Sequence, residues 1–278
     1  MGKGILALVM LMAYPTSAQV VSGSIVIFNF TQNESIVAAD SLAKNHDTGI
    51  PDYSHCKVAA FSHQLIFASV GNSGFSSSGT VLWDNIDLAR DAVRAAQNRE
   101  NKTVKVNGAL NNWAKIVKSH WDRVDRTEAK KIAMENNGQF TAGLFIGKGP
   151  TINVAVVYFD SGNTIDPIQY GEGRGNDLTN CWPCGQLKGS RICGAGVHLD
   201  LAAKFCSERK HGDRINVRTK LRGASESTKL AVKIVEMTID AYEKTAKDVG
   251  GVVDTVTITN NGGITWNSRK KECADNQD

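Results

Sequence analysis

Four short apolar runs in the first quarter of the chain have the length and composition of β-strands. They cover residues 24–30, 35–40, 57–61 and 64–71 and are rich in Val, Ile, Phe and Ala. The polar residues 31–34 between the first two runs indicate a tight turn of a β-hairpin. Because the runs are apolar almost continuously, we expect strands that are covered on both faces.

Two helices are predicted after these strands. Residues 71–79 are rich in Gly and Ser, and we expect a flexible loop there. Residues 86–97 repeat apolar side chains every three or four positions, and Asp84 is placed to cap the N-terminus of the helix. Residues 109–124 carry a second apolar stripe of the same kind. We expect the two helices to pack antiparallel to each other.

The second half of the chain predicts strands, one long helix and a final hairpin. Residues 140–149 and 151–162 are two apolar runs joined by a Gly-Pro turn. Residues 171–222 break the regular pattern and contain most of the cysteines, so we interpret them as a cysteine-rich insertion. A long helix is predicted over 227–248, and 250–266 contains two strands around the turn Asn-Asn-Gly-Gly.

This order of elements predicts an α+β fold. Helices come in pairs and strands in antiparallel runs, so two stacked antiparallel sheets between two helix layers, a four-layer αββα sandwich, would bury both faces of each sheet. A Rossmann arrangement is disfavoured because strands and helices do not alternate and no Gly-x-Gly-x-x-Gly motif leads into a helix. No cofactor motif is present, and we expect no cofactor.

The amino terminus has the pattern of a secretory signal peptide. Lys3 precedes an apolar run at 5–14, and small residues end at Ala18. The alternative is an N-terminal membrane anchor, although the run is short for a span. We therefore expect residues 1–18 to be removed, no stable membrane insertion, and a secreted or periplasmic protein in an oxidising compartment.

The composition limits the partners. The chain has 278 residues, with 32 Lys and Arg against 28 Asp and Glu, a net charge of +4. That excess is small and forms no basic stripe, which argues against nucleic acid as a partner. The six histidines show no metal-ligand spacing, and we expect them at the surface or in loops.

The six cysteines allow three interpretations. Four lie within one region: Cys181, Cys184, Cys193 and Cys206. They could hold a structural Zn²⁺ through four thiolates. In an exported chain, two disulfides that staple a loop are favoured. The weakest interpretation takes the Cys-Trp-Pro-Cys sequence as a redox dithiol. Cys56 and Cys273 stand alone.

Three motifs in a fixed order carry a resemblance to a known family. Gly precedes a hydroxyl residue at the head of the first strand in SGSIVIFNF; IVAADS is followed by CKVAAF and ASVG; and a long helix is followed by KDVGGVVDTVTIT. The chain thereby resembles proteasome β-type subunits and their bacterial relatives, which are N-terminal-nucleophile (Ntn) hydrolases, over most of 22–170 and 224–266. The resemblance implies the αββα sandwich, an amide hydrolase that cleaves peptides or other amides, and a homo-oligomer as one form of assembly.

The resemblance also implies roles for five residues. Ser24 takes the position of the nucleophile, which is usually Thr in the family. Asp40 matches the aspartate that holds the supporting lysine, and Lys57 matches that lysine. Gly71 matches the residue whose N–H forms the oxyanion hole, and Asp248 matches the second aspartate.

The chemistry of such a site depends on a free N-terminus. A serine hydroxyl is a weak nucleophile without a base, and the base here is the α-amino group of the same residue, with an ordinary pKa of about 7.7–8.0. Ser24 must therefore be released by a cut after Gly23, which the family performs on itself. Residues 19–23 would then be a propeptide, 24–268 the catalytic domain and 269–278 a polar tail.

Two further expectations follow from the resemblance. A pocket bordered by the small side chains of Ala43, Ser69 and Ser73 would accept a modest substrate group. The rival to the enzyme is a catalytically inactive relative that serves as an assembly or binding scaffold, in which Asp40 and Lys57 are only a structural ion pair.

Overall fold

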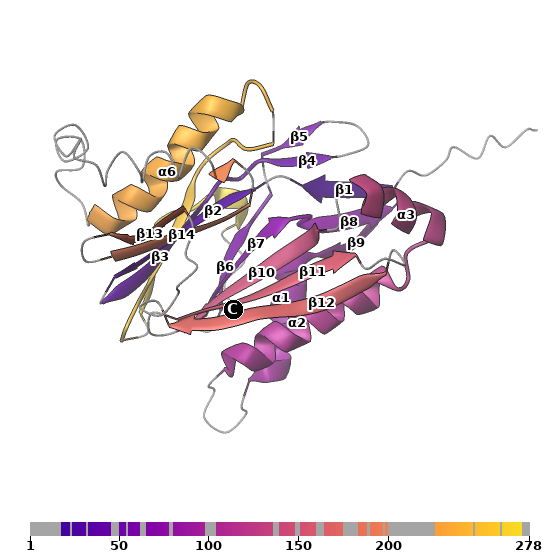
Figure 1. Cartoon of the computed structure of the whole chain (residues 1–278), viewed down its shortest axis with the longest axis horizontal. Helices are drawn as coiled ribbons and strands as arrows, with labels where there is room; N and C mark the ends of the chain where they lie inside the picture. Colours follow the sequence, from indigo (N-terminus) through magenta and orange to yellow (C-terminus); the bar gives the residue numbers. More distant parts are fainter. Residues whose placement is uncertain are drawn as a thin grey trace, which may run out of the picture.

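The computed structural model describes most of the chain outside its first 17 residues and the region 200–225. The described residues are 18–22, 24–31, 33–45, 50–53, 55–61, 65–77, 80–97, 104–135, 139–147, 151–159, 164–174, 183–187, 190–196, 198–199, 226–246, 248–261 and 263–273. Three antiparallel sheets and four helices are found in these ranges, which makes the fold α+β (Figure 1).

The first two predicted strands lie at the centre of a six-stranded sheet. Its order is β13 (Pro183–Leu187), β14 (Ser190–Gly196), β2 (Ile25–Thr31), β3 (Glu34–Ala39), β15 (Asp254–Thr259) and β16 (Ile264–Ser268). Alternate residues of β2 face opposite sides of the sheet. Ile25 and Ile27 pack with Leu230 and Ile234 of α6 (Glu226–Tyr242), while Val26 belongs to a different core cluster. Both faces are thus covered, as the continuous apolar run predicts.

The second large sheet has five strands and carries the helix pair. Its order is β12 (Ile165–Arg174), β11 (Thr151–Phe159), β10 (Gln139–Gly147), β7 (Leu65–Gly71) and β6 (Val58–Phe61). Helices α1 (Asn85–Ala96) and α2 (Val106–Trp121) pack on it, and α3 (Arg126–Glu135) follows. The rings of Phe67 and Phe145 lie 4.9 Å apart, and Trp113 of α2 is 5.7 Å from Phe67. Asp84 caps α1 by accepting from the backbone of Ile86, so that prediction is confirmed.

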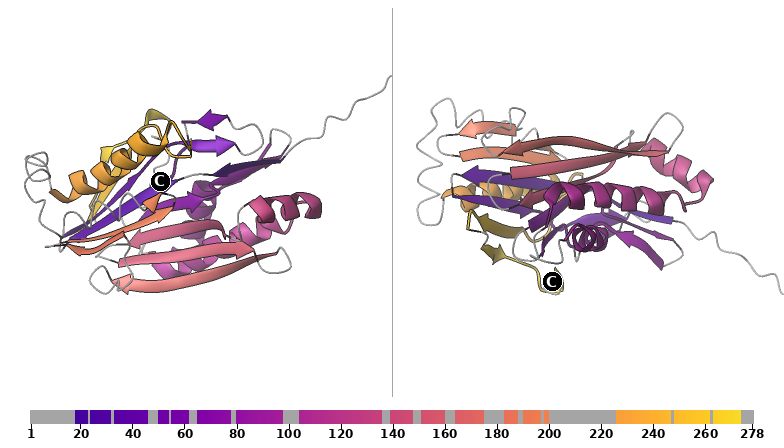
Figure 2. Two further views of the ribbon diagram at one scale, coloured as in Figure 1. Left: turned by 45° about the horizontal axis from the view of Figure 1, so that its top comes forward. Right: turned by 90° about the horizontal axis from the view of Figure 1, so that it is seen from below.

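One core cluster contains residues of both large sheets. Val26 and Phe28 of β2 share it with Ile66 of β7 and Leu144 of β10. Helix α6 lies on one side of the molecule, and α1 and α2 lie on the opposite side (Figures 1 and 2). No helix in the described ranges is long and apolar enough to span a bilayer.

A third, smaller sheet corrects one expectation. Its order is β5 (Pro51–Asp52), β4 (Ala43–Asn45), β1 (Ala18–Ser22), β8 (Gly74–Ser77) and β9 (Thr80–Asp84). The stretch 71–79, expected to be a flexible loop, contains strand β8, because its backbone pairs with β1 and β9 even though most of its residues are Gly and Ser. The segment 18–22 ahead of Ser24 is a strand with a partner on each side.

The predicted insertion at 171–222 contains two strands of the six-stranded sheet. β13 and β14 lie inside it, yet they form one end of the six-stranded sheet, and β14 pairs along the full length of β2. Local pattern missed β14 because Cys-Gly-Ala-Gly has little apolar character, and the pairing with β2 supplies what the sequence does not show. Residues 200–222 lie outside the described residues.

The described part of the polar tail predicted at 269–278 is partly buried. Lys270 and Cys273 are buried, and Cys273 forms a disulfide with Cys56, 217 positions away in the sequence. The two cysteines that stand alone in the sequence are therefore partners in space. This bond fastens the end of the described chain to the residue directly before Lys57.

Candidate active site

An ion pair without solvent contact forms the centre of the predicted site. The Lys57 ammonium lies 2.8 Å from Asp40 Oδ1, and the two side chains are 1% and 0% exposed. Asp40 follows the end of β3, and Lys57 directly precedes β6, so the pair joins the two large sheets. The sequence-based expectation that these two residues pair is met by the geometry.

The Asp40 carboxylate is also bound to two backbone N–H groups. Its Oδ1 accepts from Ile25, the residue after Ser24, at 2.9 Å, and its Oδ2 accepts from Gly250 at 3.1 Å. The backbone N–H of Asp40 in turn donates to the carbonyl of Ile25 at 3.2 Å. Asp40 therefore fixes the first peptide group after Ser24 in place.

Lys57 is held by the chain on two sides. Its ammonium donates to the Leu42 carbonyl as well as to Asp40. Its own carbonyl accepts from the N–H of Ser69 on β7 at 3.0 Å. These contacts leave the ammonium a fixed position, which a charge that acts on a reacting group requires.

Burial and pairing act against each other in this centre. Burial raises the pKa of the Asp40 carboxyl, and the Lys57 charge and the hydrogen bonds oppose that rise. Burial lowers the pKa of the Lys57 ammonium, and Asp40 opposes it, with smaller contributions from the charges of Asp248 and Asp254. Each member of the pair therefore depends on the other to remain ionised.

Ser24 lies at the head of β2 and is 1% exposed. Gly196, the last residue of β14, lies against it, and a Cβ built on Gly196 would lie 2.0 Å from the Ser24 carbonyl oxygen. Gly196 also has a φ of +107°, so only glycine suits this position. Gly23, the other side of the predicted cut, lies outside the described residues.

Gly71 ends β7, where the chain turns from one sheet into the next. Its φ is +84°, and a Cβ there would lie 2.9 Å from the Phe140 carbonyl oxygen. The conformation therefore needs glycine. The small residues predicted to border a pocket, Ala43, Ser69 and Ser73, are all buried.

Asp248 stands near the centre but is bound to a residue that the sequence does not single out. Its carboxylate oxygens lie 2.8 and 2.9 Å from His198 Nε2. His198 was expected at the surface or in a loop; its side chain is 20% exposed. The sequence also gives no hint of the Gly250 N–H and the Leu42 carbonyl, because backbone partners leave no residue pattern.

Of the four clustered cysteines, the structure describes only Cys193 in full, and this residue favours a disulfide over zinc. Cys193 is disulfide-bonded, and a cysteine in a disulfide offers no thiolate to a metal. Cys181 and Cys206 lie outside the described residues, as does the side chain of Cys184. Within the described ranges, no group of three or more His, Cys, Asp or Glu side chains is arranged to hold a metal ion.

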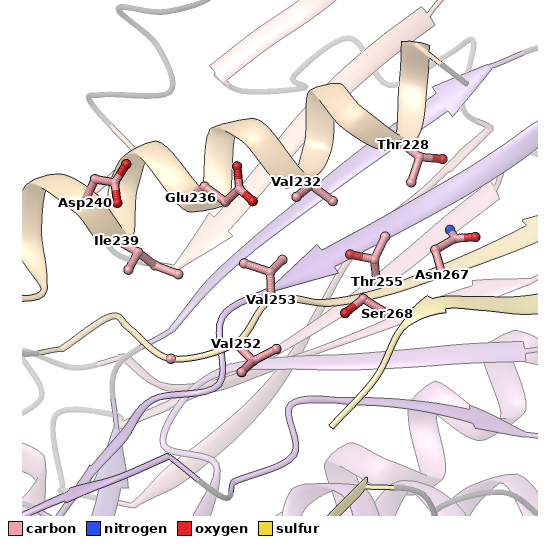
Figure 3. Close-up of a pocket in the computed structure, with 11 residues that line it drawn as sticks. Thr228, Val232, Glu236, Ile239, Asp240, Val252, Val253, Thr255, Asn267 and Ser268 are labelled. Carbon is pink, nitrogen blue, oxygen red and sulfur yellow. The ribbon is translucent and has the colours of Figure 1, made fainter. Parts of the chain in front are cut away.

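A hollow of about 660 Å³ lies between α6 and the strands β15 and β16 (Figure 3). It contains none of the predicted site residues, so it is separate from the candidate active site. Its lining residues come from α6, from the turn before β15 and from both strands: Thr228, Val232, Glu236, Ile239, Asp240, Gly251, Val252, Val253, Thr255, Asn267 and Ser268.

Comparison with known proteins gives similarity at the level of solved structures. No protein-family model matches the chain, and no curated protein matches it. Among solved structures, it is similar to one described as Anbu (Gly-1) mutant from Hyphomicrobium sp. strain MC1, with a TM-score of 0.46 and 12% identity over 91% of this chain and 88% of the other.

Proposed function

We propose that this chain is the precursor of an N-terminal-nucleophile amide hydrolase with a four-layer αββα fold, in which Ser24 becomes the nucleophile. The observation that carries the proposal is the buried Asp40–Lys57 pair, whose carboxylate binds the peptide N–H directly after Ser24. A buried ion pair is costly to form and weak as a source of stability. Since the pair lies beside the first peptide group of β2, a role in catalysis at Ser24 would account for its presence.

The proposed mechanism uses the residues in the following way. Once the Gly23–Ser24 bond is cut, the α-amine of Ser24 takes the proton of its own hydroxyl and later returns it to the leaving amine. The fixed charge of Lys57 disfavours protonation of that amine, and Asp40 keeps Lys57 charged. The N–H of Gly71 stabilises the oxyanion, a contribution of about 3–4 kcal/mol in comparable sites.

Strand β1 supports a peptide as the substrate. Val21 pairs with Asn45 of β4 on one side and with Gly74 of β8 on the other, so the segment ahead of Ser24 lies extended between two strands. After a cut before Ser24, the same two strand edges would be able to receive another extended chain, which is a common mode of peptide recognition. The substrate class we propose is therefore an extended peptide.

An exported location agrees with two features. The Cys56–Cys273 disulfide requires an oxidising compartment to persist, and the apolar segment at 5–14 has the form of a signal peptide. Removal of residues 1–18 alone would leave Ser24 as an internal residue. The second cut, before Ser24, is the activating step in this proposal.

The test is the mature N-terminus together with activity. The chain and its Ser24→Ala variant are expressed for export, and intact mass is measured after reduction. We expect the unsubstituted chain to begin at Ser24 and to cleave fluorogenic peptides, and the variant to retain residues 19–23. Ser24→Thr is the matched control, since threonine supplies the same hydroxyl and should be processed.

Two outcomes would contradict the proposal. A mature protein that begins at Gln19 in both forms would favour a binding or assembly scaffold. Identical processing of the Ser24→Ala variant and the unsubstituted chain would show that the cut does not depend on the hydroxyl.

A further inference from the structure

We propose that His198 is a positioning residue of the Ser24 site, acting through Asp248 on the loop that holds Asp40. The inference rests on the proposed function, because it assigns a role in the same site. It concerns an imidazole outside the five residues that the sequence resemblance supplies.

The imidazole is held from two directions. His198 Nε2 lies 2.8 and 2.9 Å from the two carboxylate oxygens of Asp248. The ring also stacks on Tyr242, with centroids 3.8 Å apart and the planes inclined by 11°. The side chains of His198 and Asp248 are 20% and 29% exposed, so the pair is largely shielded from water. A charged hydrogen bond in such surroundings has a defined geometry.

The backbone of His198 adopts an unfavourable conformation. Its φ is 55°, and among the described residues no other non-glycine has a positive φ. A residue with a side chain occupies this region at an energetic cost unless its surroundings hold it there. The carboxylate and the tyrosine ring are the two contacts that hold this one.

His198 and Asp248 join two segments that both reach the site. Gly196, two residues before His198, packs on the carbonyl of Ser24. Gly250, two residues after Asp248, donates its N–H to Asp40 Oδ2. The carbonyl of Gly250 accepts from the N–H groups of Ser41 and Leu42 at 3.1 and 3.0 Å. The His198–Asp248 contact therefore fastens the end of β14 to the loop 248–251.

The role that follows is mechanical and electrostatic. By contacting both carboxylate oxygens of Asp248, the imidazole fixes the start of the loop 248–251. The N–H of Gly250, which binds Asp40, lies two residues further along this loop. The Asp248 charge also raises the pKa of the Lys57 ammonium, so a fixed Asp248 helps to keep Lys57 charged. His198 touches none of the reacting atoms in this scheme and acts through its partner.

The experiment compares two substitutions that separate the hydrogen bond from the stacking. His198→Gln keeps an N–H donor for Asp248, and His198→Phe keeps a ring for Tyr242 but has no donor. His120→Phe is the control, because His120 lies on α2 beside Trp83 and outside this cluster. Hydrogen exchange of the Gly250 amide is followed by NMR, and kcat and KM are measured on a fluorogenic peptide.

We expect His198→Phe to lower the protection of the Gly250 amide by about tenfold or more, the size of a lost hydrogen bond to a charged group. The kcat should fall by a similar factor while KM stays within about twofold, since the substrate-binding strands are untouched. His198→Gln should restore both quantities to within about threefold of the unsubstituted protein. His120→Phe should change neither.

The inference and the proposed function fail separately. If processed protein hydrolyses no peptide, the proposed function fails, and Gly250 exchange alone decides whether His198 holds the loop. If the protein is active but His198→Phe matches it in exchange and in kcat, or His198→Gln is no better than His198→Phe, the positioning role is wrong. Should His198→Phe not fold, Asp248→Ala removes the acceptor of the same contact and is expected to give the same loss of protection.

Discussion

Separating the Asp40–Lys57 pair gives the most direct measure of its energetics. Three variants are compared: Asp40→Asn, Lys57→Met and the double substitution. Both residues are buried, and Asp40 accepts from Lys57, Ile25 and Gly250. Removing one partner of such a pair leaves the other charge uncompensated, which costs about 3–5 kcal/mol of unfolding free energy.

The double variant should be far more stable than the two single losses together would predict. With neither charge present there is no unpaired ion to bury, although Ile25 and Gly250 now meet an amide in place of a carboxylate. One imperfect hydrogen bond costs about 1–3 kcal/mol. We therefore expect the double variant to lose about 1–3 kcal/mol, well below the sum of the single losses.

Urea unfolding at pH 7.5 measures these losses of unfolding free energy. A series at lower pH tests whether the loss in Lys57→Met becomes smaller or larger on acidification. In Lys57→Met, burial raises the pKa of Asp40 with no ammonium to oppose it, so the folded state favours the protonated acid. Stability is then present at low pH and is lost as the pH rises through that pKa. The deficit relative to the unsubstituted protein should therefore shrink toward pH 5. Additive single losses, or a deficit that grows on acidification, would refute the reasoning.

Two other predictions concern residues around this centre. Gly71→Ala should destabilise the protein by more than about 1 kcal/mol and reduce activity, because φ is +84° and the new Cβ would press on the Phe140 carbonyl. Thermal unfolding measures the loss of stability. The control is Gly108→Ala in α2, which should be neutral or stabilising by up to about 1 kcal/mol. Burial lowers the pKa of His55 from 6.5 to about 4, so its contribution to stability is complete above pH 6.5 and is lost as the pH falls toward 4. Between pH 7.5 and 4.5, the unfolding free energy of His55→Gln should therefore rise by about 2.5 kcal/mol relative to that of the unsubstituted protein, as measured by urea unfolding. A difference in unfolding free energy that does not change with pH would contradict the lowered pKa of His55.

The sequence predicts those helices and strands that the local pattern of apolar and polar side chains is enough to identify. The strands β2, β3, β6 and β7 are nearly continuous apolar runs, and the helices α1, α2 and α6 carry apolar stripes, so the local pattern is sufficient for them. Asp40 and Lys57 are also within reach of sequence reasoning, because each flanks a buried strand. A charged residue in that position needs a partner.

The remaining features depend on contacts between distant parts of the chain. Strand β8 is made of Gly, Phe and Ser, and it is a strand because β1 and β9 lie beside it. His198 contacts Asp248, 50 positions away in the sequence, and no sequence motif predicts this pair. Cys56 and Cys273 are separated by 217 positions. Pairings of this range come from the tertiary fold, and no local window contains both partners.

The Cys56–Cys273 bond closes residues 56–273 into a covalent ring and leaves residues 1–55 outside it as an arm. Any single peptide bond broken between the two cysteines leaves the fragments joined, and they separate only after reduction. Ser24 and everything ahead of it belong to the arm. A piece cut off before Ser24 can therefore diffuse away under oxidising conditions, whereas a nick between Cys56 and Cys273 goes unseen on a non-reducing gel.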